Sequence, residues 1–376
     1  MNLGLTHEHH PYRPHQPLAA AVSLRTGDFD YHLPDHCIAQ QPVEPRDSAR
    51  LLVMHRSTGA LEHRTFRDVI DYLVPGDVLV CNDSRVLNAR LVGRRPGSGG
   101  RVEALLLREA GEPHVWETLL KPAGRLKPGA CVLFEDVHGG PPVEAQVMER
   151  GPVGTRLLRF PVGVDPKRLG VTPLPPYIRV ALADPERYQT VYARAPGSAA
   201  APTAGLHFTQ ALLDNALARG IRIVSVTLHV GLDTFRPVRE DDPSEHGMHQ
   251  EFYELSAASA RELSEAASRG SRFICIGTTS VRALEDAVER SGWDPAGDRV
   301  SQPPVLPYAG FTGKYVLPGY RFSAVDGLIT NFHLPKTTLL MLVSAFAGRA
   351  CILDAYERAQ RLGYRFYSFG DAMLLL

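Results

Sequence analysis

The 376-residue sequence predicts an α/β protein with a largely parallel main sheet, curled toward a barrel, and a small antiparallel β-barrel or sandwich inserted into it. Helical and strand-like segments alternate in the second half of the chain. Between residues 87 and 163, short apolar runs follow one another without a helical stretch. Phrases rich in His, Gly, Thr and Ser follow the later strands, which is where ligands bind in α/β proteins.

The first part of the main domain starts near residue 28. Residues 50–54 read as a strand ending at the turn 57–59, and residues 66–73 have helical spacing. A buried strand follows at 78–81 and leads into the polar phrase NDSRV at 82–86. We expect ligand contacts at such a strand end.

The inserted part shows five short strand-like runs separated by turns rich in Gly and Pro. These runs cover residues 102–107, 115–120, 131–134, 143–148 and 155–160. Their close spacing predicts an inserted domain over residues 87–163, between two pieces of the main domain at 28–86 and 164–376.

In the second half, helices are predicted over 206–218, 257–268 and 281–290, and strands over 221–227 and 272–276. Gly220 and Gly270 stand just past two helix ends, and Ser280 stands near a helix start. The apolar run 338–348 is too short to cross a bilayer and predicts a buried helix.

Bulk composition narrows the class of protein. The chain has 41 basic and 41 acidic side chains, so any contact with RNA must come from a local patch, and no membrane partner is indicated. Five scattered cysteines without a Cys-x-x-Cys pair fit a reducing cytosol and hence a cytoplasmic protein, which we expect to be a monomer. Residues 1–27, rich in His and Pro, predict a disordered extension.

Histidines and hydroxyl residues gather in phrases that predict a catalytic site. HVG (229–231) and GTTS (277–280) follow two strands, and the latter meets a helix start, where free N–H groups favour a carboxylate. HGMHQE (246–251) allows either metal ligation or acid-base work; with no third ligand visible, we expect no metal. His207 and His333 are further histidines that can carry protons.

Basic residues are concentrated between Arg85 and Lys127, where nine Lys and Arg stand against four Glu. On a β-rich module this excess favours phosphate binding, although a solvated basic face explains it almost as well. The predicted RNA contacts are Arg85, Arg90, Arg94, Arg95, Lys121, Arg125 and Lys127.

The chain closely resembles the S-adenosylmethionine:tRNA ribosyltransferase-isomerases of queuosine biosynthesis, from residue 29 to residue 373. The matching phrases include IAQ (38–40), EPRD (44–47), NDSRV (82–86), PLPPYI (173–178), YQTVYA (188–193) and PGSAAAPTAGLHFT (196–209). They continue with HGMHQE (246–251), GTTSVRALE (277–285), TNFHLP (330–335) and RFYSFGDAM (365–373). Where the family usually has Gly, the phrase HVGLDTF (229–235) carries Asp233, which tolerates a positive φ less easily.

This resemblance implies a distorted α/β barrel with an inserted β-barrel. It also implies transfer and isomerisation of the ribosyl moiety of S-adenosylmethionine onto 7-aminomethyl-7-deazaguanine at the wobble position of tRNA. The product is epoxyqueuosine-tRNA, and adenine and methionine are released. The partners are therefore tRNA and S-adenosylmethionine, the latter as co-substrate rather than prosthetic group.

The site hypotheses follow from the phrases and this chemistry. We expect proton transfer by histidines, with His229 or His249 as the base and Glu251 orienting a histidine. The full catalytic set is His207, His229, His246, His249, Glu251 and His333. The set expected to bind S-adenosylmethionine, with Arg282 as anion partner, is Thr203, Gly205, Gly231, Gly277, Thr278, Thr279, Ser280 and Arg282.

Two other functions are compatible with parts of the sequence. An ordinary S-adenosylmethionine-dependent methyltransferase would carry a glycine-rich first βα turn followed by an acidic residue, and none is visible. A non-catalytic RNA-binding protein would use the basic inserted part but would leave the His- and Thr-rich strand ends unexplained.

Overall fold

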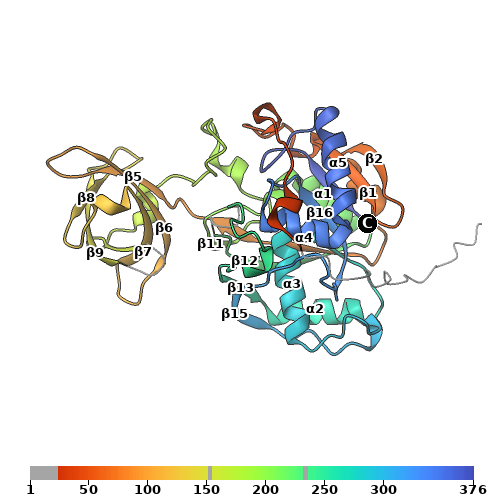
Figure 1. Ribbon diagram of the computed structural model, residues 1–376. Helices are drawn as coiled ribbons and strands as arrows, with labels where there is room; N and C mark the ends of the chain where they lie inside the picture. The colour runs from red at the N-terminus through yellow and green to blue at the C-terminus, as the bar shows by residue number, and fades with distance from the viewer. Residues whose placement is uncertain (1–23, 151–154, 232–235) are drawn as a thin grey trace, which may run out of the picture.

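The computed structural model describes residues 24–150, 155–231 and 236–376, which form a nine-stranded sheet with helices on both faces and a separate six-stranded barrel (Figure 1). Within the described residues the sheet runs from β15 at one edge to β2 at the other, in the order β15-β13-β12-β3-β14-β16-β17-β1-β2. In this order, the bounds are Tyr308–Thr312, Glu251–Leu255, Arg222–Leu228, Val78–Asn82, Phe273–Ile276, Val325–Asn331, Ala372–Leu375, Arg50–His55 and Ala60–Thr65. The neighbours β12, β3, β14 and β16 are mutually parallel, so their carboxyl ends share one edge.

The central strands are buried on both faces, which explains their nearly continuous apolar sequences. Val78 and Val80 of β3 point into one core cluster, whereas Leu79 and Cys81 point into the other. This alternation follows from the two-residue period of a strand. The sheet therefore divides the main domain into two cores.

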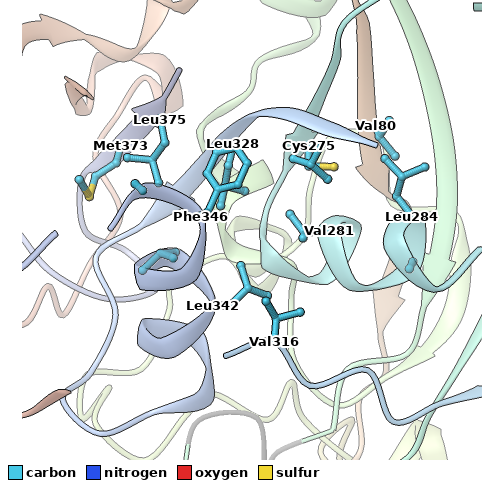
Figure 2. Packing of buried hydrophobic residues seen from close by; sticks show 14 of the residues in the cluster. Val80, Cys275, Val281, Leu284, Val316, Leu328, Leu342, Phe346, Met373 and Leu375 are labelled. Atoms are coloured by element: carbon cyan, nitrogen blue, oxygen red, sulfur yellow. The ribbon is translucent and has the colours of Figure 1, made fainter. Parts of the chain in front are cut away.

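In the described part of the chain, five α-helices cover the sheet, four on one face and one on the other. The helices on the larger core are α2 (Ala257–Ala267), α3 (Thr278–Arg290), α4 (Thr338–Ala347) and α5 (Arg349–Arg361). Figure 2 shows Val281 and Leu284 of α3 beside Val80 and Cys275, Phe346 of α4 near Leu328, and Leu342 of α4 near Val316. Helix α1 (Gln210–Ala218) and a 3₁₀ helix, η4 (Phe66–Tyr72), cover the opposite face.

The barrel lies to one side of the main sheet (Figure 1) and closes in the order β10-β7-β6-β5-β8-β9. From β5 to β10 the bounds are Arg90–Arg94, Arg101–Glu109, Val115–Lys121, Cys131–Phe134, Val143–Arg150 and Arg156–Arg159. Every pairing is antiparallel, and Trp116, Val132 and Phe134 are among the residues that fill the interior. A two-stranded sheet of β4 (Ser84–Val86) and β11 (Ala195–Ser198) lies where the barrel joins the main domain.

The structure confirms the α/β class and the inserted antiparallel barrel. The main sheet is more mixed than predicted, because β13, β15, β17 and β2 each have an antiparallel neighbour. The predicted helix over 206–218 is divided at Thr209, which caps α1 and follows a 3₁₀ turn, η9 (Thr203–His207). Helix α3 begins three residues before its predicted start, after the N-cap Gly277.

The predicted extension over residues 1–27 reaches too far into the chain. Residues 1–23 lie outside the described part, but Thr26 is buried and its backbone N–H donates to Asp241 O at 2.8 Å. The ordered main domain therefore includes Thr26. Across the described residues, no single helix is long and apolar enough to cross a bilayer; only α4 and α5 taken jointly meet that test, across a bend of 111°.

One buried carboxylate ties α3 to the chain that enters β16. Glu285 is fully buried, and its two oxygens accept backbone N–H bonds from Ser323, Ala324 and Val325 at 2.9–3.1 Å. The Tyr320 hydroxyl donates a further bond at 2.9 Å. Since these amides are buried or half-buried, they depend on Glu285 for their hydrogen bonds.

We expect Glu285→Ala to lower the free energy of unfolding by about 3 kcal/mol or more, because it leaves several backbone donors without acceptors. Denaturant unfolding measures this change. The matched control is Glu289→Ala, one helical turn later, whose side chain is 68% exposed and pairs with Lys314. It should cost at most about 1 kcal/mol. Equal effects of the two substitutions would contradict this account of the loop.

Candidate active site

A cavity opens at the carboxyl ends of β14 and β16, bounded by the start of α3 and by segments distant in sequence. Its empty space, open mouth included, is about 570 Å³. The lining comprises Tyr177, Ala201, Pro202, Thr203, Ala204, Val230, Gly277, Thr278, Thr279, Thr330, Asn331, Phe332, His333, Leu334, Thr337, Leu339, Tyr367 and Ser368.

The first turn of α3 forms one wall of this cavity. Gly277 has a φ of +89°, a conformation that side chains rarely adopt, and it connects β14 directly to the helix. Thr278 and Thr279 follow in the first turn and line the cavity. The N–H groups of a first helical turn have no partner within the helix and carry partial positive charge. This wall is therefore suited to an anion such as a carboxylate.

A polar network fixes the opposite wall. Asn331, at the end of β16, accepts a bond from the Thr203 hydroxyl at 2.9 Å and donates to Tyr367 O at 3.1 Å. Tyr367 has a φ of +72°, unusual for a bulky residue. Its ring lies 4.4 Å from that of Tyr177, whose hydroxyl is 2.6 Å from Ser368 Oγ. These bonds hold two aromatic rings at the cavity surface.

Among the described residues, His333 is the one histidine in the lining. Its Nε2 lies 2.7 Å from Thr330 Oγ1, and its backbone N–H donates to the Tyr356 hydroxyl at 2.9 Å. The Nδ1 atom has no hydrogen-bond partner among the described residues. Burial lowers the pKa of His333 to about 3, so the imidazole is neutral at physiological pH.

The described lining contains no Asp, Glu, Lys or Arg, so the cavity is uncharged. A ligand here meets a helix N-terminus, ring faces and hydroxyl groups rather than ion pairs. Ring faces attract cations, and the helix start attracts anions. The cavity therefore fits a small molecule carrying both charges.

Comparison with known proteins identifies the family. The model of the queuosine biosynthesis protein family matches residues 26–375. The S-adenosylmethionine:tRNA ribosyltransferase-isomerases of Moorella thermoacetica and Symbiobacterium thermophilum are 53% and 52% identical to this chain. Each match covers 94% of the chain and the whole relative.

The chain belongs to the queuosine biosynthesis protein family.

The resemblance expected from the sequence phrases is thus confirmed, and this queuosine biosynthesis family member is an enzyme. The crystal structure of a Thermotoga maritima S-adenosylmethionine tRNA ribosyltransferase also matches, at 37% identity and a TM-score of 0.52. That match covers 93% of this chain and all of the other.

The cavity unites some of the residues predicted to form the site. Thr203, Gly277, Thr278, Thr279 and His333 line it. Ser280 follows in the same helical turn but its hydroxyl bonds back to Ile276 O at 2.8 Å, so it supports the turn rather than the cavity. Gly205 lies nearby in η9, where a Cβ would meet Tyr192 Oη at 2.0 Å, so packing alone requires glycine there.

Arg282 and Glu251 form a buried ion pair outside the lining. Arg282 Nη1 donates to Glu251 Oε2, and its Nε donates to Lys314 O at 2.8 Å. Glu251 Oε1 accepts the Gly231 N–H at 2.7 Å. These contacts tie α3 to β13 and to the end of β12; the roles of Arg282 as anion partner and of Glu251 as histidine-orienting group stay predictions.

The other predicted histidines are also outside the lining. His207 is buried against Phe66, with its ring nitrogens 3.1 and 2.9 Å from Ala204 O and Gly370 O. His246 Nδ1 pairs with Glu240 at 2.9 Å, and His249 is exposed. His229 lies at the end of β12, one residue before Val230 of the lining.

The predicted RNA-binding residues are spread over several surfaces. Arg85 pairs with Glu186, and Arg90 donates to Leu174 O at 2.8 Å. Arg94 and Lys121 are exposed at strand ends of the barrel, and Lys127 is exposed after β7. Arg95 is half-buried beside Gly100, and the side chain of Arg125 lies outside the described part.

Asp233, the predicted departure from the family phrase, also lies outside the described residues. In the part of the chain described, no group of three or more His, Cys, Asp or Glu is arranged to hold a metal.

Sequence reasoning missed Tyr177, Asn331, Tyr367 and Ser368 as members of the cavity wall. Each stands in a phrase that matched the family, PLPPYI, TNFHLP or RFYSFGDAM. These family phrases could therefore have pointed to the four residues as site candidates. Their convergence depends on tertiary contacts across about 190 residues, for instance between Tyr177 and Ser368.

The buried, neutral His333 predicts a pH dependence of stability. Its folded-state pKa of about 3 lies below the ordinary 6.5, so the unfolded chain takes up the proton first as pH falls. The resulting stability is complete above pH 6.5 and is lost as pH falls toward 3. Between pH 6 and 4, this group should cost the wild type up to about 1.4 kcal/mol of unfolding free energy per pH unit. The His333→Gln variant should not show this part of the loss. Denaturant titrations across pH measure this; parallel pH profiles of variant and wild type would contradict it.

Proposed function

We propose that the enzyme transfers and isomerises the ribosyl moiety of S-adenosylmethionine onto 7-aminomethyl-7-deazaguanine at the wobble position of tRNA. Epoxyqueuosine-tRNA is the product, and adenine and methionine leave. The observation that carries this proposal is the uncharged cavity between the first turn of α3 and the rings of Tyr177 and Tyr367. The names of the relatives, which include S-adenosylmethionine and tRNA, support it.

Two charged groups of S-adenosylmethionine, the carboxylate and the sulfonium, have a complementary wall in this cavity. The methionyl carboxylate binds at the backbone N–H groups of Thr278 and Thr279, where the helix dipole favours negative charge. The sulfonium lies against the faces of Tyr177 and Tyr367, which attract a cation without a counter-charge. Asn331 and Thr203 supply polar groups for the ribosyl hydroxyls.

The chemistry requires protons to be moved at two places. The sulfonium acidifies the adjoining 5′ carbon, and a base takes its proton. The electron pair left on this carbon forms a double bond to C4′ as the C4′–O4′ bond breaks, and O4′ forms a carbonyl with C1′ as adenine leaves with the electron pair of its glycosidic bond. We assign the base to His333, because it lies in the described lining of the cavity and its Nδ1 has no hydrogen-bond partner among the described residues. Once protonated, this buried imidazolium is a strong acid and gives its proton to the departing adenine.

The amine of the modified base supplies the nucleophile. It must lose a proton before it attacks the ribosyl group, and methionine departs as the strained epoxide ring forms. His229 lies one residue from the cavity lining, and burial lowers the pKa of its imidazole, so it is neutral and able to accept this proton. His229 and His333 thus take the two proton-transfer roles.

The direct test incubates the enzyme with S-adenosylmethionine and tRNA carrying 7-aminomethyl-7-deazaguanine, followed by mass spectrometry of the nucleosides. We expect epoxyqueuosine in the RNA and adenine and methionine in solution. A methylated nucleoside would instead indicate a methyltransferase. Binding of RNA without any product would indicate a non-catalytic RNA-binding protein, and either result would refute the proposal.

The role of His333 is tested by His333→Gln, which keeps a polar side chain of similar size. Because it removes the proton carrier, the substitution should lower kcat for adenine release about 10²- to 10⁴-fold, with a smaller change in KM for S-adenosylmethionine. His55→Ala, in the pair with Glu62 at the far hairpin β1–β2, is the control and should keep wild-type kcat. Full turnover in alanine variants of His207, His229, His246, His249 and His333 alike would rule out histidine catalysis.

A further inference from the structure

A groove lies between the barrel and the main domain, and most of the charged side chains in its lining are basic. Its empty space, open solvent included, is about 1080 Å³, and the charged residues that line it are Arg85, Lys167, Arg168 and Glu186. Arg168 is exposed, and the Lys167 ammonium lies 3.9 Å from Asp165. The chain as a whole has balanced charge, but the basic side chains in this lining attract an anion locally.

The wall of the groove adjoins a residue that packs against His229. Pro196, in the groove wall, belongs to β11 and is the register partner of Arg85 in β4. The next residue, Gly197, lies against the imidazole of His229: a Cβ on this glycine would come within 2.5 Å of His229 Nε2. Only glycine leaves room for the ring at this point, so the backbone of β11 and the imidazole form one continuous surface.

From His229 an aromatic row crosses three strands. The His229 ring is stacked on Phe252 of β13, with centroids 5.9 Å apart and an interplanar angle of 20°. Phe252 is the cross-strand partner of Phe311 in β15, and their centroids are 5.8 Å apart. Phe311 is 48% exposed on the edge strand. Figure 1 places β11, β12, β13 and β15 along the side of the main domain that faces the barrel.

A basic groove that continues into partly exposed rings has the two features that proteins use for unpaired nucleic acid. Cationic side chains hold the phosphates, and ring faces stack on splayed bases. The row also passes the cavity, because Val230, the neighbour of His229, lines it. A base displaced from the strand at this point is next to the cavity entrance.

We propose that the groove and the His229–Phe252–Phe311 row form one track for a single-stranded loop of the tRNA, with phosphates at Lys167 and Arg168 and bases on the rings. This inference rests on the proposed function for the identity of the RNA. The main phosphate contacts are then Lys167 and Arg168, whereas the sequence predicted contacts at barrel residues such as Arg94 and Lys127. Of the predicted contacts whose side chains are described, Arg85 lines the groove.

The test measures binding of a fluorescently labelled tRNA transcript to the full-length enzyme over a range of salt concentrations. Phe311→Ala should raise Kd about tenfold, because base–aromatic stacking contributes at this level, and Phe311→Trp should restore binding. Lys167→Ala combined with Arg168→Ala should reduce the slope of log Kd against log salt by about 1.4. Calorimetry with S-adenosylmethionine should give the wild-type Kd in all three variants.

The controls remove equivalent groups elsewhere on the surface. Leu362→Ala removes an apolar side chain that is 51% exposed after α5, and Arg261→Ala with Arg269→Ala removes two exposed cations at α2. Both should bind tRNA as the wild type does. Thermal unfolding of every variant establishes that it is folded.

Wild-type Kd and salt slope in the Phe311→Ala and Lys167/Arg168 variants would overturn the track, even if the enzyme forms epoxyqueuosine. Sedimentation showing a wild-type dimer that Phe311→Ala dissociates would also overturn it, since the row would then be an interface between copies of this chain. If the wild type makes no product but its tRNA binding falls in these variants as predicted, the track stands and the proposed reaction is refuted.

Discussion

The parallel pairing of β3, β14 and β16 is the constraint on which the site depends. Because these strands run in the same direction, Asn82, the Gly277–Thr279 turn and the residues after Thr330 all emerge at one edge. The side chain of Asn82 holds these strand ends together. Its amide N–H donates to Leu228 O on β12 and its amide oxygen accepts the Leu228 N–H, both at 2.9 Å. The amide also donates to Thr279 Oγ1 at 3.3 Å. A buried amide that contacts two neighbouring elements leaves the strand ends little freedom to shift.

The absence of ionised side chains from the described lining gives the cavity its chemical character. An ion pair inside such a space would need compensation for the lost hydration of both charges. A helix N-terminus and ring faces provide weaker fields without that penalty, because they are part of the fold before any ligand arrives. Burial in the same lining lowers the pKa of His333, so its imidazole is neutral at physiological pH. Charged side chains lie outside this lining, in the Arg282–Glu251 pair and in the groove beside the barrel.

Local sequence patterns predicted much of the fold. The strand over 131–134 coincides with β8 (Cys131–Phe134), and Gly220 and Gly270 follow α1 and α2 with positive φ, as expected of helix ends. These features depend on neighbours in sequence, which is why they are readable. The site was only partly predictable because its members converge through tertiary packing. Thr278 and Thr279 were found from a strand-to-helix turn, whereas Tyr177 and Tyr367 have no local pattern that distinguishes a cavity wall from a core. Conversely, His207 stands in a polar phrase that reads as catalytic, yet its ring is held by two backbone carbonyls.

The central claim is that the cavity between α3 and the rings of Tyr177 and Tyr367 is where S-adenosylmethionine binds. A crystal structure of the enzyme with S-adenosylmethionine tests it most directly. We predict density for the ligand in this cavity, with its carboxylate at the N–H groups of Thr278 and Thr279, its sulfur against the rings, and a ribosyl carbon near His333. Ligand density outside this cavity, or in it with the carboxylate turned away from α3, would contradict the account.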